Sequence, residues 1–443
     1  MYVVIVGAGE VGSTIAESLA TDHEVAVVDI DGDRVEQLMY DTDVLGIEGD
    51  GADLETLREA DIEAADILIA STDDDETNIV TCSTTMTVTD TFSIARVKSE
   101  KYLRTWEQSE RAFGVDHMVA TNLLTAEKIA RVVGLPAARD VESFADGAVQ
   151  MAEFDVSESS PVADRTVEAA DRYDSLTFAA VIRDEKVVIP RGDTVLKPGD
   201  DIIVIGSPAS VQTFAHELEP DTDGARNILI VGGSDVGYQT ARLLQERGLK
   251  PRLIERDYGR ARELAEELTE TTVLESDATD REFLEREHIE DVDVVIPALD
   301  NDEKNLLAGL LAKRLGAERA VAVVDSGEYV PLFEAVGIDV AVNPREATAE
   351  EITRFTHEKH AENVAIIESD RAEVLEIEAD GESVLTGRPI RESVADLPDG
   401  VVIGAITRAG EFVIPRGDTV IEAGDHVVVF ADAASLDEAT ALL

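Results

Sequence analysis

The chain has 443 residues, a length at which we expect roughly three or four domains, because single hydrophobic cores stop growing well before that size. Its 94 aspartates and glutamates outnumber 38 lysines and arginines, and the resulting charge of −56 argues against binding to DNA, RNA or anionic lipid. The acidic residues alternate with many Val, Ile and Leu residues, which predicts a folded protein with an acidic surface.

Residues 1–135 alternate apolar runs, which predict strands, with amphipathic stretches, which predict helices. The strands are YVVIV, EVAVV, DVLGIEGD, DILIAS and FSIARV, and the helices are Gly12 to Ala20, Arg34 to Tyr40, Leu54 to Glu59 and Asn78 to Val88. Strands that alternate with helices favour a parallel sheet with right-handed crossovers. We therefore predict a doubly wound, Rossmann-like domain over 1–135.

The following stretch, 136–219, differs in character, because short strands and turns replace the helices. Its segment KVVIPRGDTVLKPGDDIIVIG joins apolar runs by Pro-Arg-Gly-Asp and Lys-Pro-Gly-Asp, which are typical turn sequences. We predict a small β-rich α+β module. The Arg-Gly-Asp tripeptide is interpreted as part of a tight turn and not as an adhesion motif.

The same order then returns. VIPRGDTV at Val188 to Val195 recurs at Val413 to Val420, and the earlier Ile5-Val6-Gly7 recurs at the same offset as Ile230-Val231-Gly232. An internal repeat of this kind indicates duplication of a whole unit. We therefore predict a second Rossmann-like domain over 226–357 and a second module over 358–443, joined to the first half by a short polar linker.

A glycine-rich motif opens the first repeat. In VVIVGAGEVGSTIAESL, the glycines of G-x-G-x-x-G stand between a predicted buried strand and a helix, the context in which this pattern is specific for dinucleotides. The first glycine permits a tight turn, the second lets the backbone approach a pyrophosphate, and the third allows close helix packing. The candidate pyrophosphate-binding residues are Gly7, Ala8, Gly9, Glu10, Val11 and Gly12.

Polar residues that follow the other predicted strands complete the candidate site. Asp29 ends the second strand and is placed to accept hydrogen bonds from a ribose, while Asp31 and Asp33 would repel a 2′-phosphate, so NAD(H) or an adenine nucleotide such as ATP or ADP is favoured over NADP. Asp50 is a candidate for the adenine or its ribose. The strand ends further supply Ser71 and Thr72 for base and sugar, and Arg96 as a cation for phosphate.

The second repeat carries VGGSDVG, in which Gly232, Ser234 and Gly237 occupy the three glycine places. A side chain at Ser234 would crowd a pyrophosphate, although Glu255 still closes the second strand and Asp277 matches Asp50. Two interpretations stay open for this half: a second nucleotide site, or a structural remnant. We expect the two halves to be unequal, with the first as the main dinucleotide site.

Other kinds of site find little support in the sequence. Cys82 is the only cysteine, so neither an intramolecular disulfide nor a cysteine-based zinc site can form. His357 and His360 are one helical turn apart, but no third metal ligand accompanies them, so we expect no metal site. P-loop, H-E-x-x-H and G-x-S-x-G patterns are absent. An NAD-dependent oxidoreductase is a rival hypothesis, against which we find no domain to carry a catalytic acid or base.

The N-terminal sequence MYVVIVGAGE predicts a strand and no secretory signal. The chain also contains no apolar run near the roughly 18 residues that span a bilayer. We therefore expect a cytoplasmic protein that reaches the membrane only through a partner.

In combination, these motifs resemble the TrkA family of regulatory subunits of potassium uptake systems, whose members contain cytosolic domains that regulate potassium conductance. The resemblance covers essentially the whole chain. It is carried by GAGEVG with Asp29, by Gly49-Asp50, by STDDDETN and LDNDEKNLLAGLLAKRLG, by IARV, and by the two PRGDTV modules. The acidic composition further resembles that of haloarchaeal proteins.

The resemblance implies a non-enzymatic, peripheral protein at the inner face of the cell membrane. It would bind NAD(H) or adenine nucleotides and gate an integral-membrane Trk-type potassium transporter, and four chains would supply eight such units to a ring. A potassium channel or another ion transporter is the alternative partner. Some relatives carry an arginine that contacts ATP phosphate where this chain has Glu10, which puts a preference for ATP in doubt.

Overall fold

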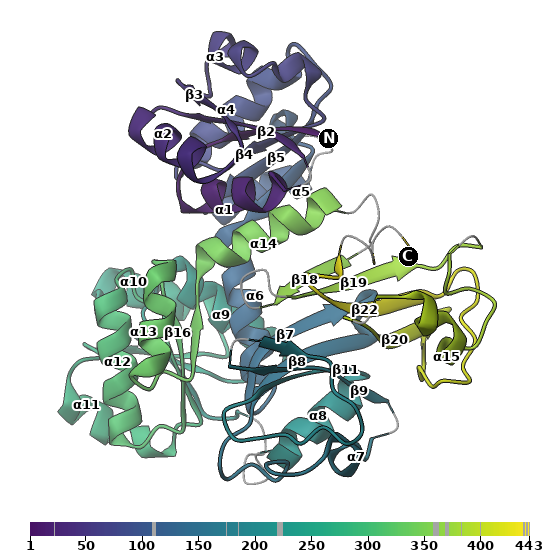
Figure 1. Ribbon diagram of the computed structural model, residues 1–443. Helices are drawn as coiled ribbons and strands as arrows, with labels where there is room; N and C mark the ends of the chain where they lie inside the picture. The colour runs from purple at the N-terminus through teal and green to yellow at the C-terminus, as the bar shows by residue number, and fades with distance from the viewer. Residues whose placement is uncertain are drawn as a thin grey trace. The chain divides into compact units, whose positions relative to one another are not determined.

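The computed structural model describes all residues except 22, 109–111, 174, 185, 219–224, 358–362, 368–371, 382, 399, 437–438, 440–441 and 443. Figure 1 shows the chain coloured from the N-terminus to the C-terminus. Its residues form two compact units: 1–129 with 227–353, and 130–226 with 354–443. Segments that are tandem in the sequence are thus sorted by type, so that both α/β halves share one unit and both β-rich modules share the other.

The first α/β half is built on a parallel sheet of six strands in the order β3-β2-β1-β4-β5-β6. This is the order of a dinucleotide-binding doubly wound fold, in which the order reverses between the first and fourth strands. The strands are β1 (Tyr2–Val6), β2 (Glu24–Asp29), β3 (Leu45–Glu48), β4 (Ile67–Ala70), β5 (Phe92–Val97) and β6 (His117–Ala120). The helices are α1 (Glu10–Leu19), α2 (Gly32–Asp41), α3 (Leu54–Glu59), α4 (Asp75–Met86), α5 (Glu100–Glu107) and α6 (Thr121–Gly134).

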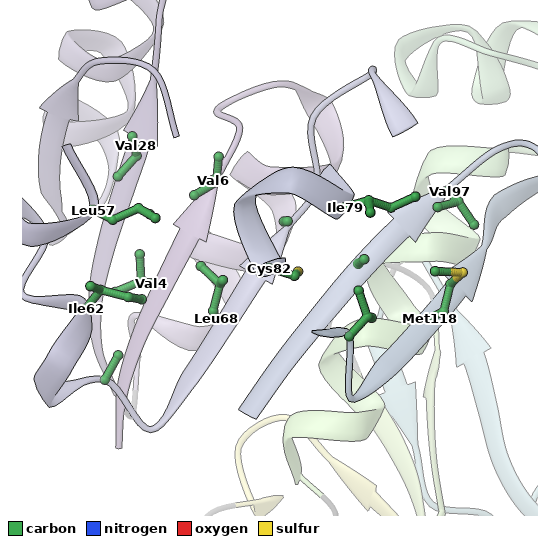
Figure 2. Close-up of a cluster of buried hydrophobic side chains, with 14 of the residues drawn as sticks. Val4, Val6, Val28, Leu57, Ile62, Leu68, Ile79, Cys82, Val97 and Met118 are labelled. Carbon is green, nitrogen blue, oxygen red and sulfur yellow. The ribbon is translucent and has the colours of Figure 1, made fainter. Parts of the chain in front are cut away.

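Both faces of this sheet are buried, as expected for parallel strands covered by helices. On one face, Val4 and Val6 of β1 pack in a cluster that contains Leu57 of α3 and Cys82 of α4 (Figure 2). Val3, on the opposite pleat of β1, is buried as well. Cys82 is fully buried in this core, and burial raises the pKa of its thiol to about 12.

The second α/β half repeats the architecture with strand order β14-β13-β12-β15-β16-β17. Its strands are β12 (Ile228–Val231), β13 (Arg252–Glu255), β14 (Thr272–Glu275), β15 (Val294–Pro297), β16 (Arg319–Val323) and β17 (Val340–Val342). Its helices are α9 (Asp235–Glu246), α10 (Tyr258–Glu267), α11 (Arg281–Arg286), α12 (Asp302–Leu315), α13 (Val330–Ala335) and α14 (Pro344–His357). The apolar strands and the small residues of α12 form one core, which includes Leu229, Val295 and Ala308.

The second unit contains two antiparallel sheets of five strands, in the orders β10-β9-β11-β8-β7 and β18-β19-β22-β20-β21. The first module consists of β7 (Ala138–Phe144), β8 (Val149–Asp155), α7 (Val167–Ala170), β9 (Leu176–Arg183), β10 (Lys186–Val188), β11 (Asp201–Gly206) and α8 (Pro208–Leu218). The second consists of β18 (Asn363–Ile367), β19 (Ala372–Glu378), α15 (Ile390–Ser393), β20 (Val401–Arg408), β21 (Glu411–Val413) and β22 (His426–Asp432).

The two modules share a hydrophobic core in which Phe144 and Ile205 of the first pack with Phe430 of the second. A hydrogen bond of 2.9 Å from the Thr177 hydroxyl to the Gly404 carbonyl also joins them. The repeated PRGDTV segments lie in turns next to β10 and β21. Near each turn a partly exposed arginine pairs with a buried aspartate, Arg183 with Asp200 at 2.6 Å and its counterpart Arg408 with Asp425 at 2.8 Å.

The predicted fold class is confirmed, with two Rossmann-like sheets and two small β-rich modules. Five strands were predicted for each parallel sheet and six are present. The additional strands are β6, of four residues, and β17, of three, and each lies at one edge of its sheet. Helix α4 begins at Asp75, earlier than predicted, because Asp74 caps it by accepting a hydrogen bond from the Thr77 amide. The domain boundaries stay predictions.

Candidate functional site

The turn between β1 and α1 requires glycine at two positions for reasons of packing alone. Gly7 has φ of +110°, and a β-carbon there would lie 2.9 Å from the Thr72 nitrogen. A β-carbon at Gly12 would lie 1.8 Å from the Gly7 carbonyl oxygen, so helix and turn approach too closely for any side chain. Gly9 differs, because the nearest atom to a β-carbon would be an Arg34 nitrogen at 3.8 Å. The space beside Gly9 is therefore open.

The N-terminus of α1 has no side-chain cap. Gly9 is its N-cap residue, in an extended conformation. The first amides of a helix have no partner within the helix and carry the positive end of its dipole. An uncapped helix start beside an open glycine is therefore suited to an anionic group.

Asp29 stabilises this glycine-rich turn through hydrogen bonds to its backbone. Its Oδ2 accepts the Ala8 amide at 2.6 Å and its Oδ1 accepts the Asp31 amide at 2.9 Å. Carboxylate oxygens have further lone pairs, so Asp29 retains capacity for another donor such as a ribose hydroxyl. The predicted ribose residue thus also organises the glycine-rich loop.

Across the sheet, a buried asparagine that the sequence analysis did not single out fixes the loop after β4. Asn78 Oδ1 accepts the Thr72 amide at 2.9 Å, and its Nδ2 donates to the carbonyls of Thr72 and Arg96, each at 2.9 Å. Asn305 makes the corresponding bonds to Leu299 and Val323. The repeated patterns DETN and DEKN contained the signal, because an asparagine recurs at the same place after each fourth strand.

Arg96 is a buried, positively charged side chain. It is 3% exposed, and its guanidinium donates to the Thr121 hydroxyl at 3.1 Å and to the Ser71 and Thr72 carbonyls at 3.4 Å. Burial lowers its pKa below the ordinary arginine value, an effect that the charge of Asp73 opposes. Arg96 lies beneath the loop after β4 and provides a fixed positive charge at the floor of the site.

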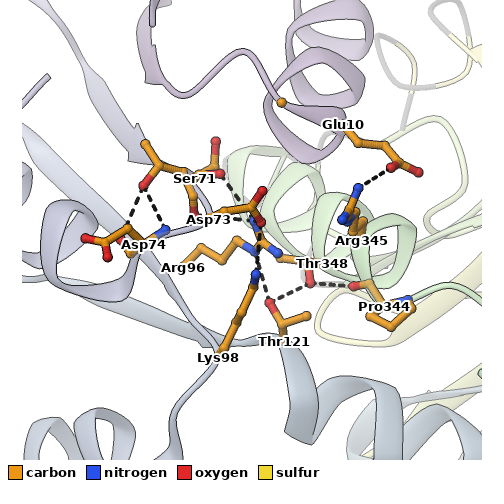
Figure 3. A network of polar contacts seen from close by, with 12 residues as sticks. Glu10, Ser71, Asp73, Asp74, Arg96, Lys98, Thr121, Pro344, Arg345 and Thr348 are labelled. Atoms are coloured by element: carbon orange, nitrogen blue, oxygen red, sulfur yellow. Dashed lines mark hydrogen bonds and ion pairs between the residues drawn. The ribbon is translucent and has the colours of Figure 1, made fainter. Parts of the chain in front are cut away.

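A second arginine, which the sequence analysis also missed, comes from the other repeat. Arg345, at the start of α14, pairs with Glu10 of α1 at 2.5 Å (Figure 3). It also pairs with Asp325 at 2.9 Å. The Gly327 amide donates to the same Glu10 carboxylate at 2.9 Å. No local sequence pattern predicts this contact, because its residues are more than three hundred positions apart.

Arg345 also influences the acidic side of the site. Burial raises the pKa of Asp73, but the hydrogen bond and charge of Lys98, together with the charges of Arg96 and Arg345, outweigh burial and hold that pKa below its ordinary value. Burial lowers the pKa of Arg345, and its bond to Glu10 and the nearby acidic charges more than compensate. Both groups are therefore charged near neutral pH.

These residues surround a cavity of about 450 Å³, which we call the first cavity. Nine predicted site residues border it: Gly7, Gly9, Glu10, Val11, Asp29, Asp50, Ser71, Thr72 and Arg96. Ala8 and Gly12 do not border it, since Ala8 is bonded to Asp29 and Gly12 packs against the turn. Asp50 Oδ1 accepts the Ala52 amide at 2.9 Å, so it shapes its own loop as well.

The turn after β12 has the same backbone but a different helix start. Ser234 Oγ donates to the Ala298 carbonyl at 2.6 Å and accepts the Gly237 amide at 3.2 Å, so the chain itself caps α9. Glu255 Oε2 accepts the Gly233 amide at 2.8 Å, as Asp29 does in the first repeat. Gly232 has φ of +108° and Gly237 packs against it, which repeats the packing roles of Gly7 and Gly12.

A larger cavity of about 870 Å³, the second cavity, lies at this turn. Ser234 and Glu255 border it, whereas Gly232, Gly237 and Asp277 do not; Asp277 caps its own loop through the Thr279 amide at 2.8 Å. Arg96 and Arg345 border both cavities.

Within the described part of the chain, no group of three or more His, Cys, Asp or Glu side chains is arranged to hold a metal ion. His360 lies outside the described residues, and the side chain of His357 is not described. No described helix is long and apolar enough to cross a membrane.

Comparison with protein families places this geometry in a known context. The TrkA-N domain model matches residues 3–121 and 228–344, and the TrkA-C domain model matches 151–219 and 374–443. The chain is 38% identical to Trk system potassium uptake protein TrkA homolog 1 of Methanosarcina mazei, over 99% of both chains. It is 34% identical to TrkA of Vibrio alginolyticus, over 97% of this chain and 95% of that protein.

Among solved structures, the chain resembles the RCK domain of GsuK, with a TM-score of 0.62 and 20% identity over 99% of this chain and 95% of that one. The GsuK channel bound to NAD also has a TM-score of 0.62 and 20% identity, over 99% of this chain and 79% of the channel. At this level of identity the similarity concerns the fold.

Proposed function

The chain belongs to the TrkA family, and we propose that it is a regulatory subunit of potassium transport that binds NAD(H) or an adenine nucleotide in its first α/β half. In this proposal the ligand lies in the first cavity. Its occupancy then alters the activity of an integral-membrane Trk-type potassium transporter. The role is binding and signalling, with no catalytic step.

The observation that carries the proposal is the open position at Gly9. Packing explains Gly7 and Gly12, but a β-carbon at Gly9 would meet no atom closer than 3.8 Å. A glycine that the fold does not need, next to an uncapped helix N-terminus, supports close approach of a ligand's pyrophosphate to the backbone.

The acidic residues at the first cavity favour a ligand whose ribose carries no 2′-phosphate. Asp29 borders the first cavity, and Asp31 and Asp33 follow it at the start of α2. An added 2′-phosphate near these carboxylates would be repelled, and the half-exposed Arg34 is already close to Asp31 at 3.5 Å. We propose that NAD(H) is bound in preference to NADP(H), with ATP or ADP as the alternative ligand.

Membership of the family also supports proposals about where the protein lies and how its chains assemble. The protein would lie in the cytoplasm, at the inner face of the membrane, held there by its transporter. Four chains would form a ring of eight α/β units. A ligand can shift such an assembly only if it binds two ring shapes with different affinity, and a coupling of about 1 to 3 kcal/mol would change transport some five- to a hundredfold.

Calorimetric titration of the full chain with NADH, NADPH and ADP in molar KCl tests the binding proposal. Molar salt is needed because a charge of −56 repels itself when unscreened. We expect saturable binding of NADH and weaker binding of NADPH. Absence of binding by all three ligands would contradict the proposal, as would turnover of NADH with a carbonyl substrate.

Purification from detergent-solubilised membranes of the native organism tests the partner. We expect an integral-membrane potassium-uptake transporter to accompany the tagged chain. Recovery of a potassium channel or another ion exporter would support the alternative partner. Recovery of the chain without any transport protein would contradict a transport role.

A further inference from the structure

Arg345 belongs to the second repeat but borders the first cavity. It follows Pro344 at the first turn of α14, and its amide donates to Asn343 Oδ1 at 2.7 Å, which fixes the root of the side chain. The side chain is 26% exposed, so its guanidinium is partly shielded from solvent. The second repeat thus places a permanent positive charge at the rim of the first cavity.

In this structure the guanidinium group of Arg345 pairs with two carboxylates. Glu10 Oε2 contacts one guanidinium nitrogen at 2.5 Å and Asp325 Oδ2 contacts another at 2.9 Å. Glu10 is the first residue of α1, which directly follows the open position at Gly9. A carboxylate at this position repels an incoming phosphate, and it also occupies the guanidinium group that a phosphate would use.

The second cavity lacks this arrangement. Asp235, which corresponds to Glu10, lies 3.7 Å from Arg260 of its own repeat. Asn122, which corresponds to Arg345 at the start of the other crossover helix, is uncharged and donates to the Lys98 carbonyl at 3.0 Å. Arg345 borders both cavities, but its carboxylate partner Glu10 lies at the first cavity, whose helix start is uncapped.

A pyrophosphate carries more charge than a single carboxylate, and guanidinium groups bind phosphate oxygens through two parallel N–H donors. Building on the proposed nucleotide site, we propose that Arg345 is a phosphate-binding residue of the first cavity and that Glu10 is its internal competitor. The Glu10 carboxylate holds the guanidinium until phosphate replaces it. This exchange links occupancy of the first repeat to helix α14 of the second.

The test uses calorimetry on the full chain in molar KCl with ADP, NADH and, as a phosphate-free probe, adenosine. Arg345→Gln should weaken ADP and NADH binding by about tenfold, the usual size of a lost charged hydrogen bond, and leave adenosine binding unchanged. Glu10→Gln should strengthen ADP and NADH binding by about three- to tenfold, because it removes the competitor.

Glu350→Gln is the matched control. Glu350 also lies on α14 and pairs with Lys128 of the first repeat at 3.5 Å, but it borders neither cavity. Its substitution loosens the same inter-repeat contact and should leave all three affinities unchanged.

The inference is overturned if the wild type binds ADP while Arg345→Gln binds it equally well, or if adenosine binding falls as much as ADP binding. Unchanged affinity in Glu10→Gln also overturns it, and this variant keeps the test decisive if Arg345→Gln folds poorly. Failure of the wild type to bind ADP and NADH at all would overturn the proposed function itself, and the inference with it.

Discussion

The turns after β1 and β12 occupy the same place in two sheets of the same topology. Each begins with a glycine of positive φ, Gly7 at +110° and Gly232 at +108°, and each ends with a glycine that packs against the first. Of the three glycine places, only the middle one differs: Gly9 leaves the start of α1 open, whereas Ser234 caps α9. The fold therefore requires the outer glycines, and only the middle residue distinguishes a turn open to a ligand from one closed by its own side chain.

The buried asparagines are expected to behave alike in both repeats, and they set the scale of structural effects. Asn78→Ala and Asn305→Ala each remove the side-chain hydrogen bonds to one backbone amide and two carbonyls, so each should lower the free energy of unfolding by about 3 kcal/mol. Thermal or denaturant unfolding in molar KCl measures this. A large loss in one repeat and none in the other would break the structural equivalence of the two halves.

Converting the first turn into the second is the next largest effect. Gly9→Ser should fold normally, because a β-carbon has room, but it should weaken NADH binding by about 1 to 3 kcal/mol as the side chain occupies the phosphate position. Ser234→Gly is the reciprocal control and should cost only a few tenths of a kcal/mol in stability, since glycine is a tolerated N-cap. NADH affinity that is the same in wild type and Gly9→Ser would contradict the assignment of the first turn.

Asp29 and Glu255, the acidic residues that hydrogen-bond to the two turns, allow a further comparison of the repeats. Asp29→Asn removes a charged acceptor and should weaken NADH binding by about 1 to 2 kcal/mol while reducing discrimination against NADPH. Glu255→Gln, the same change in the second repeat, should leave the main NADH affinity unaltered. If titration shows that the two variants lose NADH affinity equally, the assignment of the main site to the first repeat is contradicted.

The smallest effect concerns acid stability. The pKa of Asp73 lies below its ordinary value of 3.8, so its charged form stabilises the folded chain above that pH, and the contribution is lost as pH falls through the lower folded pKa. Because its side chain is 63% exposed, the contribution should stay under about 1 kcal/mol. Unfolding curves of wild type and Asp73→Asn should therefore differ near neutral pH and converge as the pH falls below the lowered pKa of Asp73. A gap that widens on acidification would contradict this sign.

Much of the fold was predictable because its signals are local. Glycine spacing, strand and helix periodicity and the repeated PRGDTV turns depend on neighbours in the sequence, and they identified the Rossmann-like halves and the modules. The placement of Asp29 at a strand end followed from the same reasoning.

What the sequence could not show depends on distant residues. Arg345 reaches the first cavity only because the two α/β halves share a unit, and no pattern in NPREATAEE indicates a partner at Glu10. Ser234 was expected to crowd a ligand, but the structure adds that its hydroxyl caps α9 and donates to Ala298. To predict that bond, one would have to know which strand end lies next to the turn.

The stoichiometry of NADH binding to the full chain tests the central claim most directly. Calorimetric titration in molar KCl should give one high-affinity NADH per chain, because the first helix start is open and the second is capped by Ser234. Two equivalent NADH sites per chain would contradict the inequality of the repeats, and so would a single site that survives Gly9→Ser and disappears on substitution in the second turn.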